Sequence, residues 1–204
     1  SFHLAEHFRP AIDKPQYQAH IARIQEYILA GDCYQVNYAQ RFEATLEGDA
    51  WSAYRYVRTL LAGGFSGFLR TAEDHAILSL SPERFLRIHH GTVTSQPIKG
   101  TAPRHPDPEQ DAALAKALLN SEKDRAENVM ITDLLRNDLG QFCETGSVRV
   151  TELCGLHSFN NVHHLISTVE GKLAPGVSAG QMLLATSPGG SITGAPKKRA
   201  VEII

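Results

Sequence analysis

The sequence predicts an α+β protein whose core is a mostly antiparallel β-sheet with flanking helices. Three observations lead to this fold class. Short strand-like runs separated by turn signals fill residues 65 to 98, a pair of helix-forming segments follows at residues 107 to 140, and two more strand-like runs lie within residues 147 to 173. Runs of strands interrupted by helix pairs are typical of this class.

The chain begins with a predicted helix. Tyr17, Ile21, Ile24 and Ile28 recur at helical spacing, and Gly31 is the expected stop signal. The presence of a glycine directly after the last apolar position favours a helix end at that point.

Residues 33 to 64 predict a strand and then a second helix. The alternating segment CYQVNYAQRFEATL, residues 33 to 46, is rich in strand formers. The amphipathic segment AWSAYRYVRTLLAGG, residues 50 to 64, predicts a helix that ends at Gly63 and Gly64.

Four short strands are expected next, and the turn signal His90-Gly91 is one of those that separate them, so we expect an antiparallel meander. The expected strands are residues 65 to 70, 75 to 79, 84 to 89 and 92 to 98.

The next part of the chain, up to residue 186, predicts three helices and two strands. Of these, the helix at residues 121 to 140 has Ser121 as N-cap and Gly140 as stop. The other expected elements are a helix at residues 107 to 120, strands at residues 147 to 157 and 162 to 173, and a helix at residues 178 to 186. In the Gly-rich segment that follows, Pro196 suits the first position of a new helix.

The chain shows no internal repeat and no obvious linker, so residues 1 to 204 are expected to form a single domain. It opens at Ser1 without an initiator Met, and it stops within a helix-like segment whose apolar residues Val201, Ile203 and Ile204 have nothing after them to pack on. We therefore expect a piece of a longer protein, truncated at both ends.

Composition excludes several classes of function. The 204 residues carry a net charge of -2, which gives no basic field for nucleic acid. No apolar run is long enough to span a membrane, and the N-terminus lacks a signal pattern. Three cysteines without CxxC spacing are expected to be reduced thiols in a cytoplasmic protein.

Lys99 is the first candidate for chemistry. It follows a short apolar run within SQPIKGTAPR, at the expected end of a buried strand. A buried lysine tends to lose its proton more easily, which makes its amine a usable nucleophile. The alternative is a lysine that extends from the strand end into solvent.

The segment SPGGSITGAPKKR, residues 187 to 199, is the second candidate. A Gly-rich loop that enters a helix offers free backbone N–H groups to an anion, although it does not match a Walker A loop. Lys197, Lys198 and Arg199 then lie where the helix dipole disfavours cations, so an anionic ligand or acidic neighbours are expected there. The alternative is a plain flexible loop.

Two sets of carboxylates complete the candidates. Asp124, Glu127 and Asp138 share the helix at residues 121 to 140, where a carboxylate is a potential Mg²⁺ ligand. The alternative is a solvated face with an ion pair between Lys123 and Glu127. Glu83, in LSLSPERF, is a potential general acid or base, or else part of a surface salt bridge.

These motifs occur in an order that resembles the chorismate-utilising enzymes. That family includes anthranilate synthase component I, aminodeoxychorismate synthase component I, isochorismate synthases and salicylate synthases. The resemblance covers nearly the whole chain beyond about residue 15. The motifs are GDCYQVNYAQRF, LSLSPERF, PIKGTAPR, DRAENVMITDLLRNDLG, VHHLISTV and SPGGSITGAPKKRAVEII. The resemblance implies the fold of that family.

Two positions favour the aminodeoxychorismate-forming branch. In anthranilate synthases the segment that matches PIKGT normally has alanine where this chain has Lys99. In isochorismate- and salicylate-forming relatives, a lysine that activates water stands where this chain has Gln35. The resemblance thus implies that Lys99 attacks C2 of chorismate, that ammonia then adds at C4, and that 4-amino-4-deoxychorismate results.

The resemblance also assigns roles to other residues. It implies that Glu83 is the general acid or base, that Glu127 binds Mg²⁺, and that His164 lies beside the substrate. The matching substrate-binding positions, besides Gln35, are Gly190, Ser191, Thr193 and Gly194.

The family further implies a glutamine amidotransferase subunit that delivers ammonia, and a place in p-aminobenzoate and folate biosynthesis. Its members are about twice as long as this chain, so residues 1 to 204 are expected to hold only part of the catalytic domain and to show little turnover alone. Two alternatives stay open: anthranilate synthase component I, and a non-catalytic fragment that binds chorismate-like anions.

Overall fold

The computed structural model describes residues 2–61 and 64–204. The chain divides into two compact units. Unit 1 comprises Ser1–Leu29 and Tyr38–Glu83, and unit 2 comprises Ala30–Asn37 and Arg84–Ile204. Within the described ranges, no helix has the length and apolar character needed to cross a membrane.

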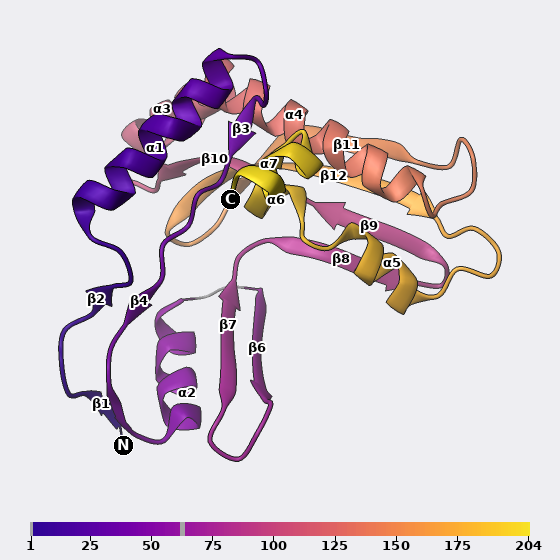
Figure 1. The fold of residues 1–204 in the computed structure, drawn as a ribbon. Coiled ribbons are helices and arrows are strands. Elements are labelled where there is room, and N and C mark those ends of the chain that lie inside the picture. Colours follow the sequence, from indigo (N-terminus) through magenta and orange to yellow (C-terminus); the bar gives the residue numbers. More distant parts are fainter. Residues whose placement is uncertain (1, 62–63) are drawn as a thin grey trace. The chain divides into compact units, whose positions relative to one another are not determined.

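Unit 1 is built from two helices and short antiparallel strand pairs (Figure 1). Asp49 caps the second helix by accepting from the backbone N–H of Ser52, and the rings of Trp51 and Tyr54 pack that helix against Phe68 on the neighbouring hairpin. The helices are α1 (Lys14–Leu29) and α2 (Ala50–Leu60), and the strands are β1 (Phe2–Leu4), β2 (Arg9–Pro10), β4 (Phe42–Glu43), β5 (Leu46–Gly48), β6 (Phe65–Arg70) and β7 (Ala76–Ser81).

The helix expected to end at Gly63 and Gly64 ends earlier, because the backbone is already extended at Leu61. Gly63 lies outside the described residues. The helix expected before Gly31 is confirmed, and Gly31 has the positive φ of 82° that favours glycine at a helix end.

The single strand expected at residues 33 to 46 is wrong. The segment instead contributes β3 (Gln35–Val36) and β4 and leads into β5, and each pairs with a different partner. Alternation indicates an extended chain, but it does not show which strand the chain will pair with. Here the partner changes every few residues, so no long strand forms.

Unit 2 is organised around a five-stranded antiparallel sheet. Its long strand β12 pairs with β11 along one edge, and with β9 and then β10 along the other. The strands are β8 (Arg84–His89), β9 (Thr92–Gln96), β10 (Ile98–Pro103), β11 (Arg149–Ser158) and β12 (Val162–Lys172). The predicted α+β class is confirmed. The single meander is wrong, because β6–β7 and β8–β9 form hairpins in separate sheets.

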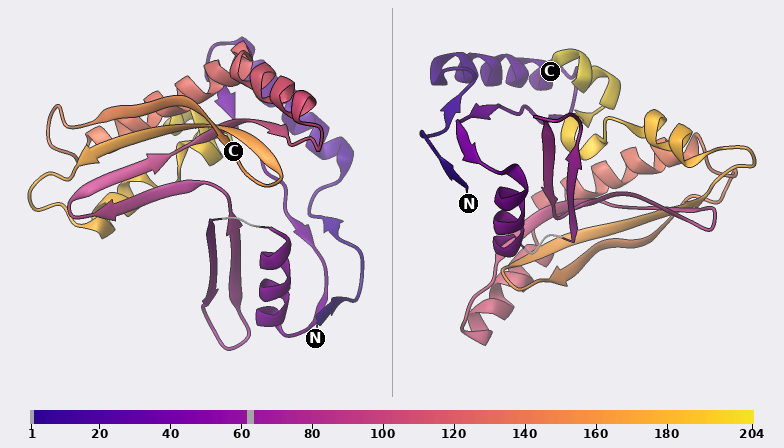
Figure 2. Two further views of the ribbon diagram at one scale, coloured as in Figure 1. Left: turned by 180° about the vertical axis from the view of Figure 1, so that it is seen from behind. Right: turned by 90° about the horizontal axis from the view of Figure 1, so that it is seen from below.

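Helices α4 (Glu122–Gly140) and α5 (Ala179–Thr186) cover one face of this sheet (Figures 1 and 2). Ser121 and Ser178 cap them by accepting backbone N–H groups three residues on, and Asp107 caps α3 (Pro108–Leu119). The buried core comprises Val93 and Val169 from the sheet, Ile131, Leu135 and Leu139 from α4, Met182 from α5, and Cys143.

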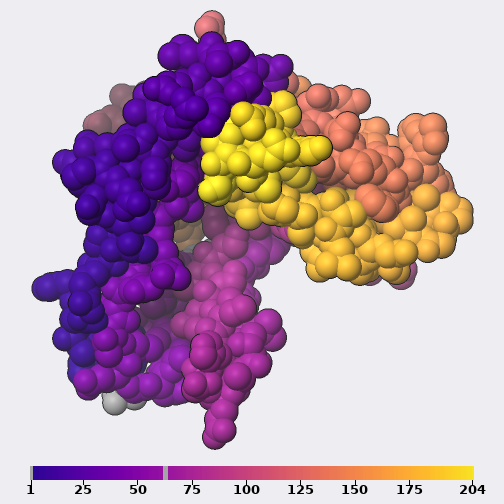
Figure 3. Space-filling model, in the orientation of Figure 1, coloured from indigo at the N-terminus to yellow at the C-terminus, as the bar shows by residue number. Residues whose placement is uncertain are grey.

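The Gly-rich segment forms three short elements: α6 (Gly190–Thr193), β13 (Gly194–Ala195) and α7 (Lys197–Ile203). Helix α7, yellow in Figure 3, lies on the surface of unit 2. Pro196 is the N-cap of α7 and not its first helical residue, which corrects the prediction. The reason is that β13 pairs with β3, which keeps the backbone extended as far as Pro196.

Candidate active site

Lys99 is the second residue of β10, which begins at Ile98 and continues to Pro103, so it lies near the beginning of a strand and not at the end of the one expected over residues 92 to 98. Its side chain is 14% exposed. The Nζ atom donates to the carbonyl oxygen of Ser191 at 3.3 Å and lies 3.6 Å from Oε1 of Glu127. The amine therefore faces α4 and α6 within unit 2, and the alternative of a lysine extended into solvent is wrong.

Glu127 is the residue on which distant segments converge. Its Oε1 accepts from Nε2 of Gln35 at 2.7 Å, in addition to its contact with the Lys99 amine. The expected alternative, a solvated face on which Lys123 pairs with Glu127, does not describe this side chain, which is only 29% exposed. One carboxylate thus connects β3, β10 and α4.

Two buried polar atoms near this carboxylate lack a hydrogen-bond partner among the described residues. They are Oε1 of Gln35, whose Nε2 binds Glu127, and Oγ of Ser191, whose carbonyl oxygen binds Lys99. Because buried polar atoms are nearly always paired in folded proteins, a pair of unpaired atoms beside an amine and a carboxylate fits a polar ligand or water.

The two end glycines of the predicted binding loop fit close backbone packing. A Cβ at Gly194 would lie 2.1 Å from the carbonyl oxygen of Gln35, and its φ of 142° is one that side chains rarely adopt. A Cβ at Gly190 would lie 2.2 Å from the side chain of Leu134 on α4. These glycines let the loop approach β3 and α4, which brings the Ser191 carbonyl to Lys99.

The hydroxyl of Thr193 donates to the carbonyl of Gly189 at 3.0 Å, so it stabilises the loop itself. Sequence reasoning missed Asn37, whose Nδ2 donates to the Ser191 carbonyl at 3.1 Å. The sequence could have indicated Asn37, because side chains two residues apart in an extended segment share a face, and Asn37 is two residues after Gln35. Both side chains contact the site.

The cations after Pro196 have acidic neighbours, one of the two expected outcomes. Nζ of Lys197 donates to Oδ2 of Asp138 at 2.5 Å, so this carboxylate of α4 supports the loop and does not join Glu127. Arg199 pairs with Asp32 at 3.2 Å and with Glu202 at 3.3 Å. Burial raises the pKa of Asp138 despite the nearby ammonium.

His164 lies on β12 opposite Thr101, and its Nδ1 is 2.8 Å from the Thr101 hydroxyl. Its ring also lies 5.7 Å from that of Phe159. Burial lowers the pKa of His164, which favours a neutral ring. Among the contacts of the described residues, none joins His164 to Lys99 or Glu127, so its place beside a substrate stays a prediction.

Glu83 is the last residue of unit 1, whereas Lys99 belongs to unit 2. Its backbone N–H donates to the hydroxyl of Ser81 at 3.2 Å, within the turn that follows β7. The role of Glu83 as general acid or base stays a prediction.

The site around Lys99 offers one carboxylate, that of Glu127, to a divalent metal ion. Within the described ranges, no group of three or more His, Cys, Asp or Glu side chains is arranged to hold a metal ion. Glu127 and the unpaired Oε1 of Gln35 are nevertheless oxygen donors of the kind Mg²⁺ prefers, and Mg²⁺ commonly uses one or two carboxylates together with substrate and water. The residues present fit such a site.

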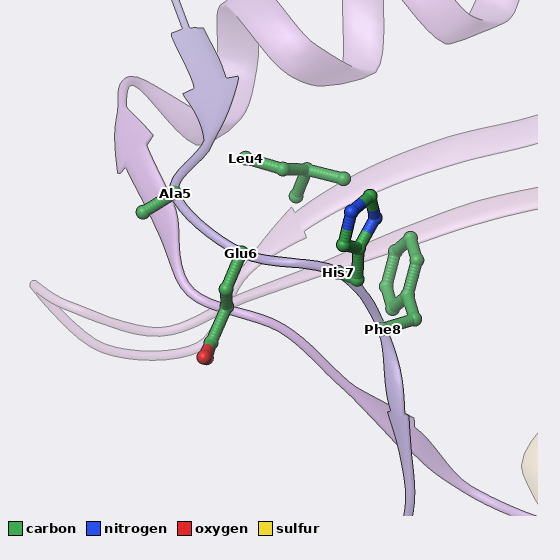
Figure 4. A pocket seen from close by; sticks show the side chains of 5 residues that line it. All are labelled: Leu4, Ala5, Glu6, His7 and Phe8. Atoms are coloured by element: carbon green, nitrogen blue, oxygen red, sulfur yellow. The ribbon is translucent and has the colours of Figure 1, made fainter.

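A pocket on unit 1 is lined by five consecutive residues near the start of the chain, Leu4, Ala5, Glu6, His7 and Phe8 (Figure 4). A second pocket, on unit 2, lies beside α5 and is lined by Phe142 and Leu184 among others. Neither contains a residue predicted for the site.

The whole chain, residues 1–204, matches the family model described as chorismate binding enzyme. It is 52% identical to aminodeoxychorismate synthase component 1 of Klebsiella aerogenes, covering 100% of this chain and 45% of the relative. It is 41% identical to anthranilate synthase component 1 of Pseudomonas putida, covering 97% of this chain and 40% of the relative.

Two solved structures superpose closely on this chain. Anthranilate synthase component I from Streptococcus pneumoniae superposes with a TM-score of 0.87 at 36% identity, over 98% of this chain and 43% of that chain. The isochorismate synthase MenF from Escherichia coli, at 19% identity over 100% of this chain and 47% of that chain, has a TM-score of 0.83, which supports the fold alone. The chain spans about half the length of the curated relatives it matches.

Proposed function

Because the chain belongs to the chorismate binding enzyme family, we propose that it carries part of the active site of an aminodeoxychorismate synthase component I. The observation that carries this proposal is the placement of Lys99. Its amine is largely buried and lies between the Ser191 carbonyl and the Glu127 carboxylate, next to two unpaired polar atoms. An amine held in this way beside unpaired polar atoms is suited to act on a bound molecule.

The proposed reaction has two displacement steps. The lone pair of the Lys99 amine forms a bond to C2 of chorismate, the two conjugated ring double bonds both shift, and the C4–O bond breaks. Glu83 supplies a proton to the departing hydroxyl, which leaves as water. Ammonia then bonds to C4, both double bonds shift back, and the C2–N bond breaks so that the lysine amine leaves with its electron pair. The proton lost by the new ammonium group restores the Glu83 acid, and the product is 4-amino-4-deoxychorismate. Covalent catalysis of this kind replaces one difficult displacement with two easier ones.

The neighbours of Lys99 orient its amine. The Ser191 carbonyl accepts one N–H, and Glu127 attracts a second. The remaining direction on the nitrogen is thus available for bond formation. Gln35 holds Glu127 by a 2.7 Å hydrogen bond, and its amide nitrogen has no basic lone pair to activate water. Lys99 is therefore the group at this carboxylate that can act as a nucleophile.

Glu127 and Gln35 would hold Mg²⁺ in the proposed enzyme, and the metal would neutralise a carboxylate of the substrate. His164 and the loop Gly190, Ser191, Thr193 and Gly194 would line the substrate site. We further propose a cytoplasmic enzyme of p-aminobenzoate and folate biosynthesis that receives ammonia from a glutamine amidotransferase subunit.

The test uses the full-length protein that contains this chain. It is incubated with chorismate, Mg²⁺ and ammonium, and the products are separated. Wild type is expected to form aminodeoxychorismate without pyruvate, and Lys99→Ala is expected to lose most of the rate. The matched control is Lys123→Ala, because Lys123 is an exposed lysine one turn before Glu127 on α4. Retention of the wild-type rate by Lys99→Ala would refute the proposed nucleophile.

Anthranilate synthase component I is the second candidate. It is favoured by the 36% identity and TM-score of 0.87 to the Streptococcus pneumoniae enzyme. The same assay separates the two, since anthranilate formation releases pyruvate. Anthranilate together with pyruvate would replace the first proposal with the second.

A further inference from the structure

Asn128 is the most completely bonded buried polar side chain near Lys99. It follows Glu127 on α4, and none of it is exposed. Its Nδ2 donates to the carbonyl oxygens of Lys99 at 3.3 Å and of Leu165 at 3.0 Å. An amide buried in this way is costly unless each of its polar atoms is paired.

The two carbonyls lie at a defect in the sheet. The β10–β12 ladder pairs Ile98 with Ile166 and then Thr101 with His164, so two residues of β10 oppose the single residue Leu165 of β12. An extra residue of this kind is a β-bulge, which locally disrupts the ladder and re-aims a side chain. The two extra-register residues are Lys99 and Gly100, and Gly100 has a φ of 97°.

The orientation of the Asn128 amide is fixed by its other side. Oδ1 accepts from the hydroxyl of Ser167. The Thr132 hydroxyl lies 3.3 Å from Oδ1, but its shorter hydrogen bond, 2.7 Å, is to the backbone carbonyl of Asn128. Ser167 Oγ itself accepts the backbone N–H of Cys154 at 2.9 Å, so its own proton is directed to Asn128. The NH₂ group must therefore face the two carbonyls, which can only accept.

We propose that Asn128 is a positioning residue for Lys99: its amide holds the β10 bulge from which the Lys99 amine reaches Glu127 and Ser191. Successive residues of a helix point about 100° apart, so Glu127 and Asn128 contact different parts of Lys99. Glu127 contacts its amine and Asn128 its backbone. This inference rests on the proposed function, in which Lys99 is the nucleophile.

The test compares two buried substitutions in the same network, in the full-length protein. Asn128→Asp keeps the side-chain shape but removes the NH₂ donors from the Lys99 and Leu165 carbonyls. Thr132→Val removes a hydroxyl that donates mainly to the backbone carbonyl of Asn128, at a residue that is only 2% exposed, and leaves both NH₂ hydrogen bonds in place. Thermal unfolding measures how much stability each variant loses, and steady-state kinetics with ammonium measures kcat and KM for chorismate.

We expect Asn128→Asp to lower kcat by about 100-fold, because a small misplacement of a reacting group has an effect of that size. KM for chorismate is expected to change little, and Thr132→Val is expected to keep kcat within about 3-fold at a similar loss of stability. Asn128→Ser, with a single hydroxyl donor, is the second variant should Asn128→Asp not fold.

A direct readout is the mass of the Lys99 peptide after single turnover without ammonia, where the proposed adduct adds chorismate minus water. Its formation is expected to slow in Asn128→Asp or Asn128→Ser and not in Thr132→Val. Equal losses of kcat in the Asn128 and Thr132 variants, or a change in KM alone, would overturn the positioning role while leaving the proposed function intact. A wild-type rate in Lys99→Ala would overturn both.

Discussion

Removal of the Lys197 ammonium is expected to destabilise the protein in a pH-dependent way. Nζ of Lys197 lies 2.5 Å from Oδ2 of Asp138 and donates to the carbonyl of Thr186 at 3.1 Å. The two charged side chains are 19% and 11% exposed. Lys197→Met keeps most of the apolar stem of the side chain but leaves the Asp138 carboxylate without this cation, in a position that is still largely desolvated.

The size of the effect lies between two limits. Breaking a fully buried ion pair destabilises a protein by about 3–5 kcal/mol, whereas an exposed pair contributes about 0–1 kcal/mol. The exposures of this pair place the expected loss for Lys197→Met at about 2 kcal/mol at pH 8. Burial already raises the pKa of Asp138, and loss of the neighbouring charge raises it further.

The sign of the pH dependence follows from that raised pKa. A carboxyl group whose pKa is higher in the folded state takes up a proton on folding, so its stabilising contribution is present at low pH and is lost as the pH rises through the folded-state pKa. The destabilisation by Lys197→Met is therefore expected to be smaller at pH 5 than at pH 8.

Urea unfolding of the full-length protein at both pH values measures this difference. The control is Lys198→Met, because Lys198 is the exposed neighbour, and it is expected to change stability by less than about 0.5 kcal/mol. The double variant Asp138→Asn/Lys197→Met is expected to recover more than half of the loss, since it removes the unpaired charge. An equal loss at pH 5 and pH 8, or no recovery in the double variant, would refute the reasoning.

Three further outcomes are expected. Gly194→Ala is expected to lower stability by about 1–3 kcal/mol in thermal unfolding, because its φ is 142° and a Cβ would lie 2.1 Å from a backbone oxygen of β3. The control is Gly180→Ala in α5, which has nothing within 4 Å of the new atom and is expected to raise stability by up to about 1 kcal/mol. Equal effects of the two substitutions would contradict the argument from φ and close packing. Arg104 holds the pKa of Asp111 below its usual range, so the stability from this carboxyl is present above about pH 4 and is lost as the pH falls further. Circular dichroism should show that Asp111→Asn loses less of its stability than wild type does as the pH falls. NMR titration of His164 should give a midpoint below about 6.5, and a higher one would contradict the effect of burial.

The fold was predictable where the signals are local. Ser121 and Ser178 cap helices that begin where the sequence places them, and the strands around His90-Gly91 pair as a hairpin. The errors lie where pairing depends on distant chain. Residues 33 to 46 alternate like one strand, yet β3 pairs with β13 while β4 and β5 pair with the first residues of the chain. No local pattern carries that information.

The site was predictable as a set of residues but not as a set of contacts. Motif resemblance singled out Gln35, Lys99, Glu127 and Ser191, and the structure brings these four together in unit 2. It did not reveal Asn37 or Asn128, because each bonds a backbone carbonyl that only the folded chain brings within reach.

The convergence on a single oxygen of Glu127 links the sequence to the proposed chemistry. The nitrogen atoms of Lys99 and Gln35 both contact Oε1, although they come from strands far apart in the sequence. The resemblance implies that a lysine stands at one position or the other in different branches of the family. We therefore expect an amine at either position to reach the same carboxylate, where two positive charges would repel each other. Under the proposed function, the position that carries the amine decides from which strand chorismate is approached, and Lys99 places that amine on β10.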